Sequence, residues 1–167
     1  MKKILVIPFF FIVSLSFSQV KNKVNADCII KPDIGINDLK LTFTSIDSIY
    51  NIFGKTELVK KDYGKDDGGV QYILTYTDKG IVVRLKKEKK SYIIISIVAQ
   101  SPCLCKTMDG VGVGSTKEEL ILKMGKPLNS WENETDSHLD YKGILFLLKN
   151  NGQNKFVIKE IMIVPIE

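Results

Sequence analysis

Apolar residues with helical spacing occur in two short stretches of the chain. In the first stretch they are separated by three and four positions: Ile46, Ile49, Tyr50 and Phe53. This spacing predicts a short amphipathic helix that begins at Thr44 or Ser45 and ends at Gly54. The second stretch, residues 110–127, reads GVGVGSTKEELILKMGKP. It predicts a tight glycine turn, a helix with a capping box and a glycine stop.

Runs rich in β-branched and aromatic residues follow each predicted helix. They cover residues 70–77, 81–85 and 92–99 after the first helix, and residues 139–141, 144–148 and 156–164 after the second. Turn residues bound these runs, which predicts three antiparallel strands after each helix. We therefore predict an α+β fold of two tandem units. Each unit has one short helix and a roughly three-stranded antiparallel sheet, and the helices lie on one face.

Residues 1–18 have the composition of a secretory signal peptide. Two lysines precede an apolar run over residues 4–17, and Ser16 and Ser18 are the small residues of a cleavage site. The apolar run is shorter than the ~20 residues that a membrane-spanning helix needs. We therefore expect a periplasmic or secreted protein that has no transmembrane anchor after cleavage.

The expected organisation of the chain has three parts. They are the signal peptide over residues 1–18, a first unit with an N-terminal extension over residues 19–101, and a second unit over residues 102–167. The whole chain carries 24 Lys and Arg against 19 Asp and Glu, a net charge of +5. This mildly basic balance lacks the clustered positive charge that nucleic-acid binding requires, so we expect no nucleic-acid partner.

The chain has three cysteines, and export would place them in an oxidising compartment. Cys103 and Cys105 are separated by one residue, which is poor geometry for a bond between them. We therefore expect Cys28 to pair with Cys103 or Cys105, leaving one thiol. The cysteines lack zinc-site spacing and the single histidine, His138, is distant in sequence, so we expect no metal ion.

Two further motifs are candidates for chemistry. The glycines of residues 110–114 follow G-x-G-x-G rather than a nucleotide-binding pattern, so we interpret them as a turn and expect no cofactor. No G-x-S-x-G motif is present, and we expect a non-catalytic protein. A carboxylate site near His138, with Glu132, Glu134 and Asp136, is the remaining enzymatic alternative.

The second helical stretch resembles two families of binding proteins. The resemblance lies in a capped helix that ends in G-K-P and is followed by a strand with an aromatic residue: Gly114, Ser115, Thr116, Glu118, Glu119, Leu120, Gly125, Lys126, Pro127 and Tyr141. These residues are similar to the SmpA/OmlA outer-membrane assembly lipoproteins and to the beta-lactamase inhibitory proteins. The chain lacks a lipobox cysteine and has a different cysteine arrangement. The resemblance implies a fold of tandem helix-plus-sheet units and a function in binding other proteins.

These observations predict an exported protein-binding module of the bacterial envelope or extracellular space. Its partner would be another envelope or extracellular protein. Because interfaces favour aromatic anchors, we expect Tyr72, Tyr76, Trp131 and Tyr141 to bind the partner from an open sheet face. The alternatives are a structural envelope protein without a discrete partner and, third, a secreted enzyme of unknown class.

Overall fold

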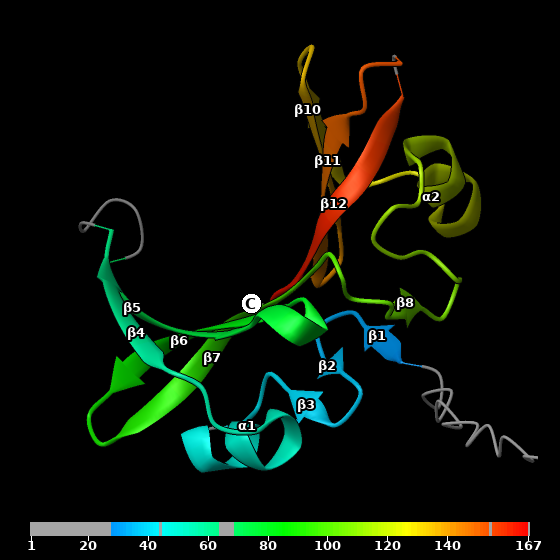
Figure 1. Cartoon of the computed structure of the whole chain (residues 1–167). Coiled ribbons are helices and arrows are strands. Elements are labelled where there is room, and N and C mark those ends of the chain that lie inside the picture. The colour runs from blue at the N-terminus through cyan, green and yellow to red at the C-terminus, as the bar shows by residue number, and fades with distance from the viewer. Residues whose placement is uncertain (1–27, 44, 64–68, 154, 167) are drawn as a thin grey trace, which may run out of the picture.

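The computed structural model describes residues 28–43, 45–63, 69–153 and 155–166. The predicted signal peptide, residues 1–18, lies outside these residues. The described chain is mostly β-structure, with one eight-stranded antiparallel sheet, one four-stranded sheet and two short α-helices (Figure 1). The prediction of an α+β fold built from tandem helix-plus-three-strand units is therefore wrong.

The large sheet is continuous across the whole molecule. Its strands, in spatial order, are β4 (Leu58–Asp62), β5 (Val70–Tyr76), β6 (Ile81–Glu88), β7 (Ser91–Gln100), β12 (Phe156–Ile163), β11 (Ile144–Asn150), β10 (Asp136–Tyr141) and β9 (Asn129–Glu132). The central pair, β7 and β12, places Ala99 opposite Ile161. This pairing merges the two halves into one sheet, which is the physical reason that the predicted separation into two sheets fails.

The strands β4 and β9 form the two edges of the large sheet and were not predicted. Their sequences, LVKKD and NSWE, lack the apolar alternation that identifies a strand with one buried face. Every residue of β9 is exposed, and only Leu58 of β4 is partly buried. Each half of the sheet thus has four strands rather than three.

A small sheet contains β3 (Leu39–Lys40), β2 (Gly35–Ile36), β1 (Ile29–Lys31) and β8 (Lys106–Thr107). The strands β1 and β8 are parallel, with Ile29 opposite Lys106. The residues just before these two strands, Cys28 and Cys105, therefore lie side by side and form a disulfide bond, with Cα atoms 4.5 Å apart. This is one of the two pairings that the sequence left open.

The helices α1 (Ile46–Phe53) and α2 (Lys117–Met124) lie where the sequence predicted them. The Ser45 side chain accepts a hydrogen bond from the backbone N–H of Asp47 and caps α1. In α2, Thr116 Oγ1 accepts from the Glu119 N–H, and the Glu119 carboxylate accepts from the Thr116 N–H, which completes a capping box. Both helices end at a glycine with positive φ.

Both helices and the small sheet lie on the same side of the large sheet (Figure 1). We call this side the covered face and the opposite side the open face. Ile49 of α1, Leu120 of α2 and Ile30 of β1 are fully buried and join one core cluster with side chains of the large sheet. Ile73 and Val98 are also buried, but they point to the open face and are not part of that cluster.

The large sheet is bent, and its open face is the inner side of the bend (Figure 1). The register of the strands shifts at Leu147/Leu148 in the β11–β12 pair and at Arg84/Leu85 in the β6–β7 pair. Such β-bulges increase the bend and twist of a sheet. In the β11–β12 pair the shift skips Lys159, which interrupts the alternation of apolar and polar residues along β12.

The small sheet contacts the large sheet at the β10–β11 turn. The Gly143 carbonyl accepts hydrogen bonds from the backbone N–H groups of Asp33 and Val164, at 3.1 and 3.2 Å. Gly143 has φ of +72°, and a Cβ atom at this position would lie 2.6 Å from the Cβ atom of Asp33. Only glycine fits this approach without a shift of the backbone.

Candidate binding site on the open face of the large sheet

The three tyrosines predicted to bind a partner lie on the covered face. Tyr76 is 4% exposed and its ring packs against Phe53 of α1, with ring centroids 5.0 Å apart. Burial, together with the nearby Tyr50, raises the pKa of Tyr76 to about 12. Tyr72 packs against Tyr92, with centroids 5.2 Å apart. These tyrosines hold the first half of the sheet together and do not form part of the open face.

Tyr141 has a similar role in the second half of the sheet. Its hydroxyl donates a hydrogen bond to the Gly125 carbonyl at the end of α2, at 2.8 Å, and its ring packs against Phe146. Burial raises the pKa of the Tyr141 phenol. Tyr141 therefore attaches α2 to the sheet. For the first half of the sheet, the sequence contains a signal for this arrangement. Tyr72 and Tyr76 are each two positions from Leu74, which is fully buried, and residues two positions apart in a strand lie on the same face.

Trp131 is the one predicted site residue that lies on the open face. It stands opposite His138 in the β9–β10 pair, and the two rings contact each other with centroids 5.2 Å apart. The Trp131 side chain is 53% exposed. Trp131 and the three tyrosines are therefore on opposite faces of the sheet and do not form one site.

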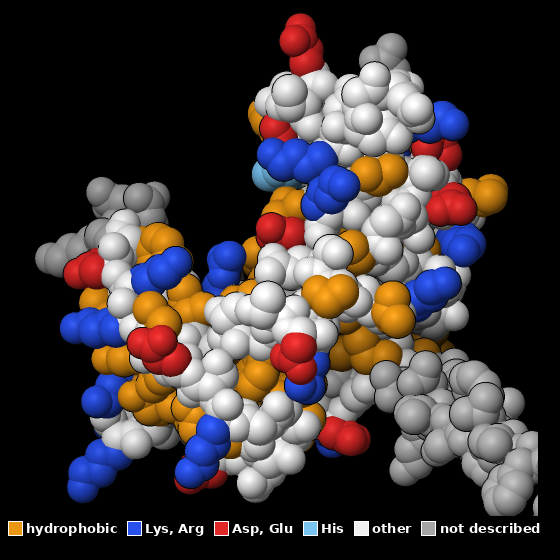
Figure 2. All heavy atoms as spheres, in the orientation of Figure 1, with side chains coloured by type: hydrophobic (Ala, Val, Ile, Leu, Met, Phe, Trp, Pro, Cys, Tyr) orange, Lys and Arg blue, Asp and Glu red, His pale blue; other side chains and the backbone are white. Residues whose placement is uncertain are grey.

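The open face contains residues that the sequence analysis missed. An apolar row crosses four neighbouring strands at the centre of the sheet, each residue opposite the next: Val82, Val98, Met162 and Leu145. Val98 is buried and the other three are partly exposed. A second row runs from Glu160 through Leu147 and His138 to Trp131. Figure 2 shows the surface hollowed between the two halves of the sheet.

Charged side chains also lie on the open face, on both halves of the sheet. By strand register, Lys61, Arg84 and Lys86 are on this face of the first half. Asp136, Asp140 and Glu160 are on the same face of the second half, together with Lys149, which pairs with Asp136. The open face therefore combines an apolar centre with basic residues on the first half and, on the second half, three carboxylates and one lysine.

Of the three carboxylates predicted near His138, Glu132 and Asp136 lie on opposite faces of the sheet, and Glu134 lies in the turn between β9 and β10. Glu132 forms an ion pair with Lys117, which is the main cause of the lowered pKa of its carboxyl group. Asp136 forms an ion pair with Lys149 at 2.5 Å, and this lysine is the main cause of the lowered Asp136 pKa. Both carboxylates thus have lysine partners. Among the described residues, no group of three or more His, Cys, Asp or Glu could hold a metal ion.

The third cysteine is separate from the open face. Cys103 is a free thiol with 6% exposure, and burial raises its pKa. A thiol with a raised pKa is a poor nucleophile, so the arrangement favours a packing role for Cys103.

Comparisons with known proteins give no family for this chain. No family model matches the chain, and the curated proteins contain no match. Among solved structures, a cysteine-rich secretory protein from Staphylococcus aureus is similar to this chain with a TM-score of 0.40 and 13% sequence identity. The match covers 71% of this chain and 43% of that protein, so it spans less than half of the neighbour's length.

Two observations bear on location. The Cys28–Cys105 disulfide is compatible with a periplasmic or extracellular protein, since disulfides persist in oxidising compartments. In the part of the chain that the structure describes, neither helix is long and apolar enough to cross a membrane.

Proposed function

We propose that this chain is an exported, non-catalytic protein-binding module that binds another envelope or extracellular protein through its open face. The observation that carries the proposal is the composition of that face. It has an apolar row at its centre, an exposed Trp131 at one side and charged residues on both halves. Specific interfaces have the same anatomy, with an apolar core, a polar rim and aromatic anchors.

The size and shape of the open face favour a protein over a small ligand. Neighbouring strands are about 4.8 Å apart, so eight strands span roughly 34 Å. This width suits an interface of about 800 Å² per partner. The concave bend fits a convex partner surface. An acidic group of the partner beside Arg84 and a basic group beside Asp140 would complement the charges at those two positions.

Capture with the mature chain, residues 19–167, tests the proposal. The immobilised chain is incubated with envelope extract and culture medium, and each captured protein is then titrated as a purified component. Trp131→Ala should weaken its binding by about 30-fold, the effect of a hot spot worth ~2 kcal/mol. Leu145→Lys should weaken it similarly, because it places a charge in the apolar row. Binding should also weaken as salt rises.

The matched control is Ile34→Ala. Ile34 is 47% exposed, close to Trp131 in exposure, but it lies in the turn between β1 and β2 of the small sheet. Its truncation should leave binding unchanged. Unchanged binding of Trp131→Ala and Leu145→Lys would show that the open face is not the interface. Retention of the protein in an insoluble wall fraction, with no partner captured, would favour the structural alternative instead.

A further inference from the structure

The outer side of β9 is a free sheet edge in the described part of the chain. The backbone N–H of Asn133 donates to the Asp136 carbonyl at 2.9 Å, and Trp131 stands opposite His138. Backbone groups of an antiparallel strand alternate between its two sides. The N–H and C=O groups of Ser130 and Glu132 therefore point away from β10 and are placed to pair with another strand.

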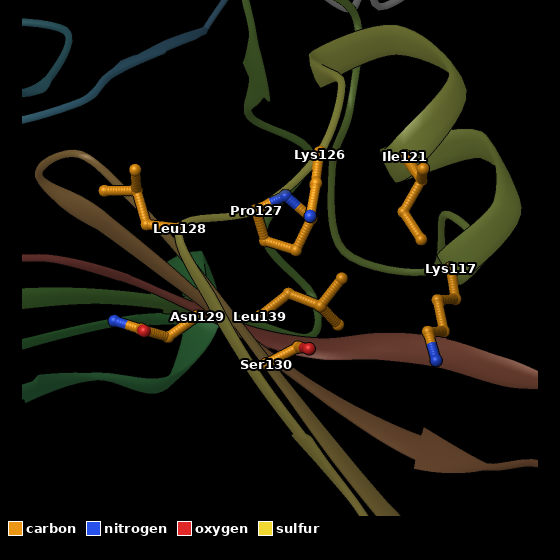
Figure 3. Close-up of a pocket in the computed structure, with 8 residues that line it drawn as sticks. All are labelled: Lys117, Ile121, Lys126, Pro127, Leu128, Asn129, Ser130 and Leu139. Carbon is orange, nitrogen blue, oxygen red and sulfur yellow. The ribbon is translucent and has the colours of Figure 1, made fainter.

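A cleft of about 340 Å³ lies beside this edge, between α2 and β9 on the covered face. Its apolar lining includes Ile121, Pro127, Leu128 and Leu139. Figure 3 shows Ile121 directed from the helix toward the cleft, with Leu139 and Ser130 on the opposite side. Ser130 stands opposite Leu139 in the sheet. A residue paired with Ser130 on an added strand would therefore lie on the cleft side of the sheet.

The opposite edge of the sheet has a different character. β4 carries Lys60 and Lys61 in the middle of a five-residue strand, and lysines on an edge strand discourage pairing. Near β9, apolar side chains are exposed beside the polar ones: Leu128 is 71% exposed and Ile121 is 38% exposed. The β9 edge is thus the one whose surroundings favour an added strand.

Two lysines line the cleft, and one of them has a positive charge that no described carboxylate neutralises. Lys117 is engaged by Glu132 and lies 5.7 Å from the centre of the Phe156 ring. Lys126 also lines the cleft, and it forms no ion pair with any residue that the structure describes. An occupant with a carboxylate near Lys126 would complement this charge.

We propose that β9 and the adjacent cleft bind an extended, acidic segment of another polypeptide. The segment adds a ninth strand to the sheet through the outward backbone groups of Ser130 and Glu132. It places an apolar side chain between Ile121 and Leu139 and a carboxylate beside Lys126. This mode of recognition takes affinity from main-chain hydrogen bonds and specificity from the side-chain pocket. The surface lies at the sheet edge and on the covered face, so it is independent of the open-face interface proposed above.

The probe is a synthetic peptide of alternating valine and threonine that ends in two aspartates. Trp131 is the only tryptophan of the chain and lies on β9, so its fluorescence reports binding directly. The peptide should change this fluorescence saturably. Ser130→Pro removes one outward N–H and obstructs the edge, and should weaken binding at least ~5-fold, the effect of one lost hydrogen bond.

The matched control for the edge is Lys60→Pro on β4. Tyr63 N–H donates to the Gly69 carbonyl, and Lys60 stands opposite Tyr72, so the same alternation directs the Lys60 N–H outward. Lys60→Pro should bind the peptide as the wild type does. Circular dichroism and thermal unfolding establish that both variants are folded.

A second pair of variants tests the cleft without altering the backbone. Ile121→Asp should weaken binding about 10-fold, because it places a charge in the apolar lining. Leu122→Asp should have no effect, since Leu122 is 84% exposed and does not line the cleft. A peptide with asparagines in place of the aspartates should bind the wild type about 3-fold more weakly, and Lys126→Gln should abolish that difference.

Three results would overturn the proposal. The first is the absence of binding at millimolar peptide. The second is equal peptide affinity for the wild type and for folded Ser130→Pro and Ile121→Asp. The third is a concentration-dependent dimer that Ser130→Pro abolishes, which would make a second copy of the chain the occupant of the edge. None of these results bears on the open face, whose test uses different variants.

Discussion

Substitution of Gly143 by alanine tests how the small sheet is attached to the large one. Gly143 has φ of +72°, a conformation that costs a residue with a side chain about 1–2 kcal/mol. The added Cβ atom would also lie 2.6 Å from both the Cβ and the backbone N atom of Asp33. Relief of this overlap requires the β1–β2 turn to move away, and this movement breaks the 3.1 Å bond from Asp33 N–H to Gly143.

The lost bond adds about 0.5–1.5 kcal/mol to the backbone strain, so Gly143→Ala should lower the free energy of unfolding by about 1.5–3.5 kcal/mol. Urea unfolding followed by Trp131 fluorescence measures this change. Gly152→Ala is the matched control, because Gly152 has φ of +81° but a Cβ atom added there would meet no atom within 4 Å. It should lose only the backbone contribution. Equal losses for the two variants would refute the docking of the β1–β2 turn on Gly143.

Three further predictions concern stability. Cys28→Ser removes a disulfide across 77 positions and should lower the free energy of unfolding by about 2–4 kcal/mol relative to the oxidised wild type; dithiothreitol should then destabilise the wild type but not the variant. Leu120→Ala should lower the free energy of unfolding, measured in urea, by about 2–5 kcal/mol, because the Leu120 side chain of α2 is fully buried. Leu122→Ala should change it little, because Leu122 is exposed. The ion pair with Lys149 lowers the pKa of Asp136, so its stabilisation is present above the unfolded pKa and is lost as pH falls through the folded one. The difference in urea midpoint between the wild type and Asp136→Asn should therefore disappear as the pH is lowered. A difference that stays constant from neutral pH to pH ~2 would show that the ion pair of Asp136 with Lys149 does not stabilise the fold.

The elements predicted well from the sequence are those with local signals. Both helices were located because Ser45 and Thr116 supply caps and Gly54 and Gly125 supply stops within a few residues of each apolar stripe. The six inner strands of the large sheet were located because each has at least one buried face and a turn beside it. These signals act over short distances along the chain, so the sequence displays them directly.

The missed features depend on contacts between distant parts of the chain. Nothing in the sequence of β7 or β12 indicates that they pair with each other, so the sheet appeared as two. The edge strands were missed because β9 and β4 have no buried face of their own. The candidate site was predicted from residue type alone, which grouped Trp131 with tyrosines that the alternation of strands places on the opposite face.

The Cys28–Cys105 disulfide also determines how the molecule would respond to mechanical load. The bond closes a covalent ring that contains α1 and the strands β4–β7, which is the whole first half of the large sheet. A force that pulls the described chain at residues 28 and 166 passes through the disulfide and leaves the ring unextended. Only the chain after Cys105 can lengthen, so α2 and β9–β12 would yield while the ring holds its length. Reduction of this single bond would allow the whole chain between residues 28 and 166 to lengthen under force.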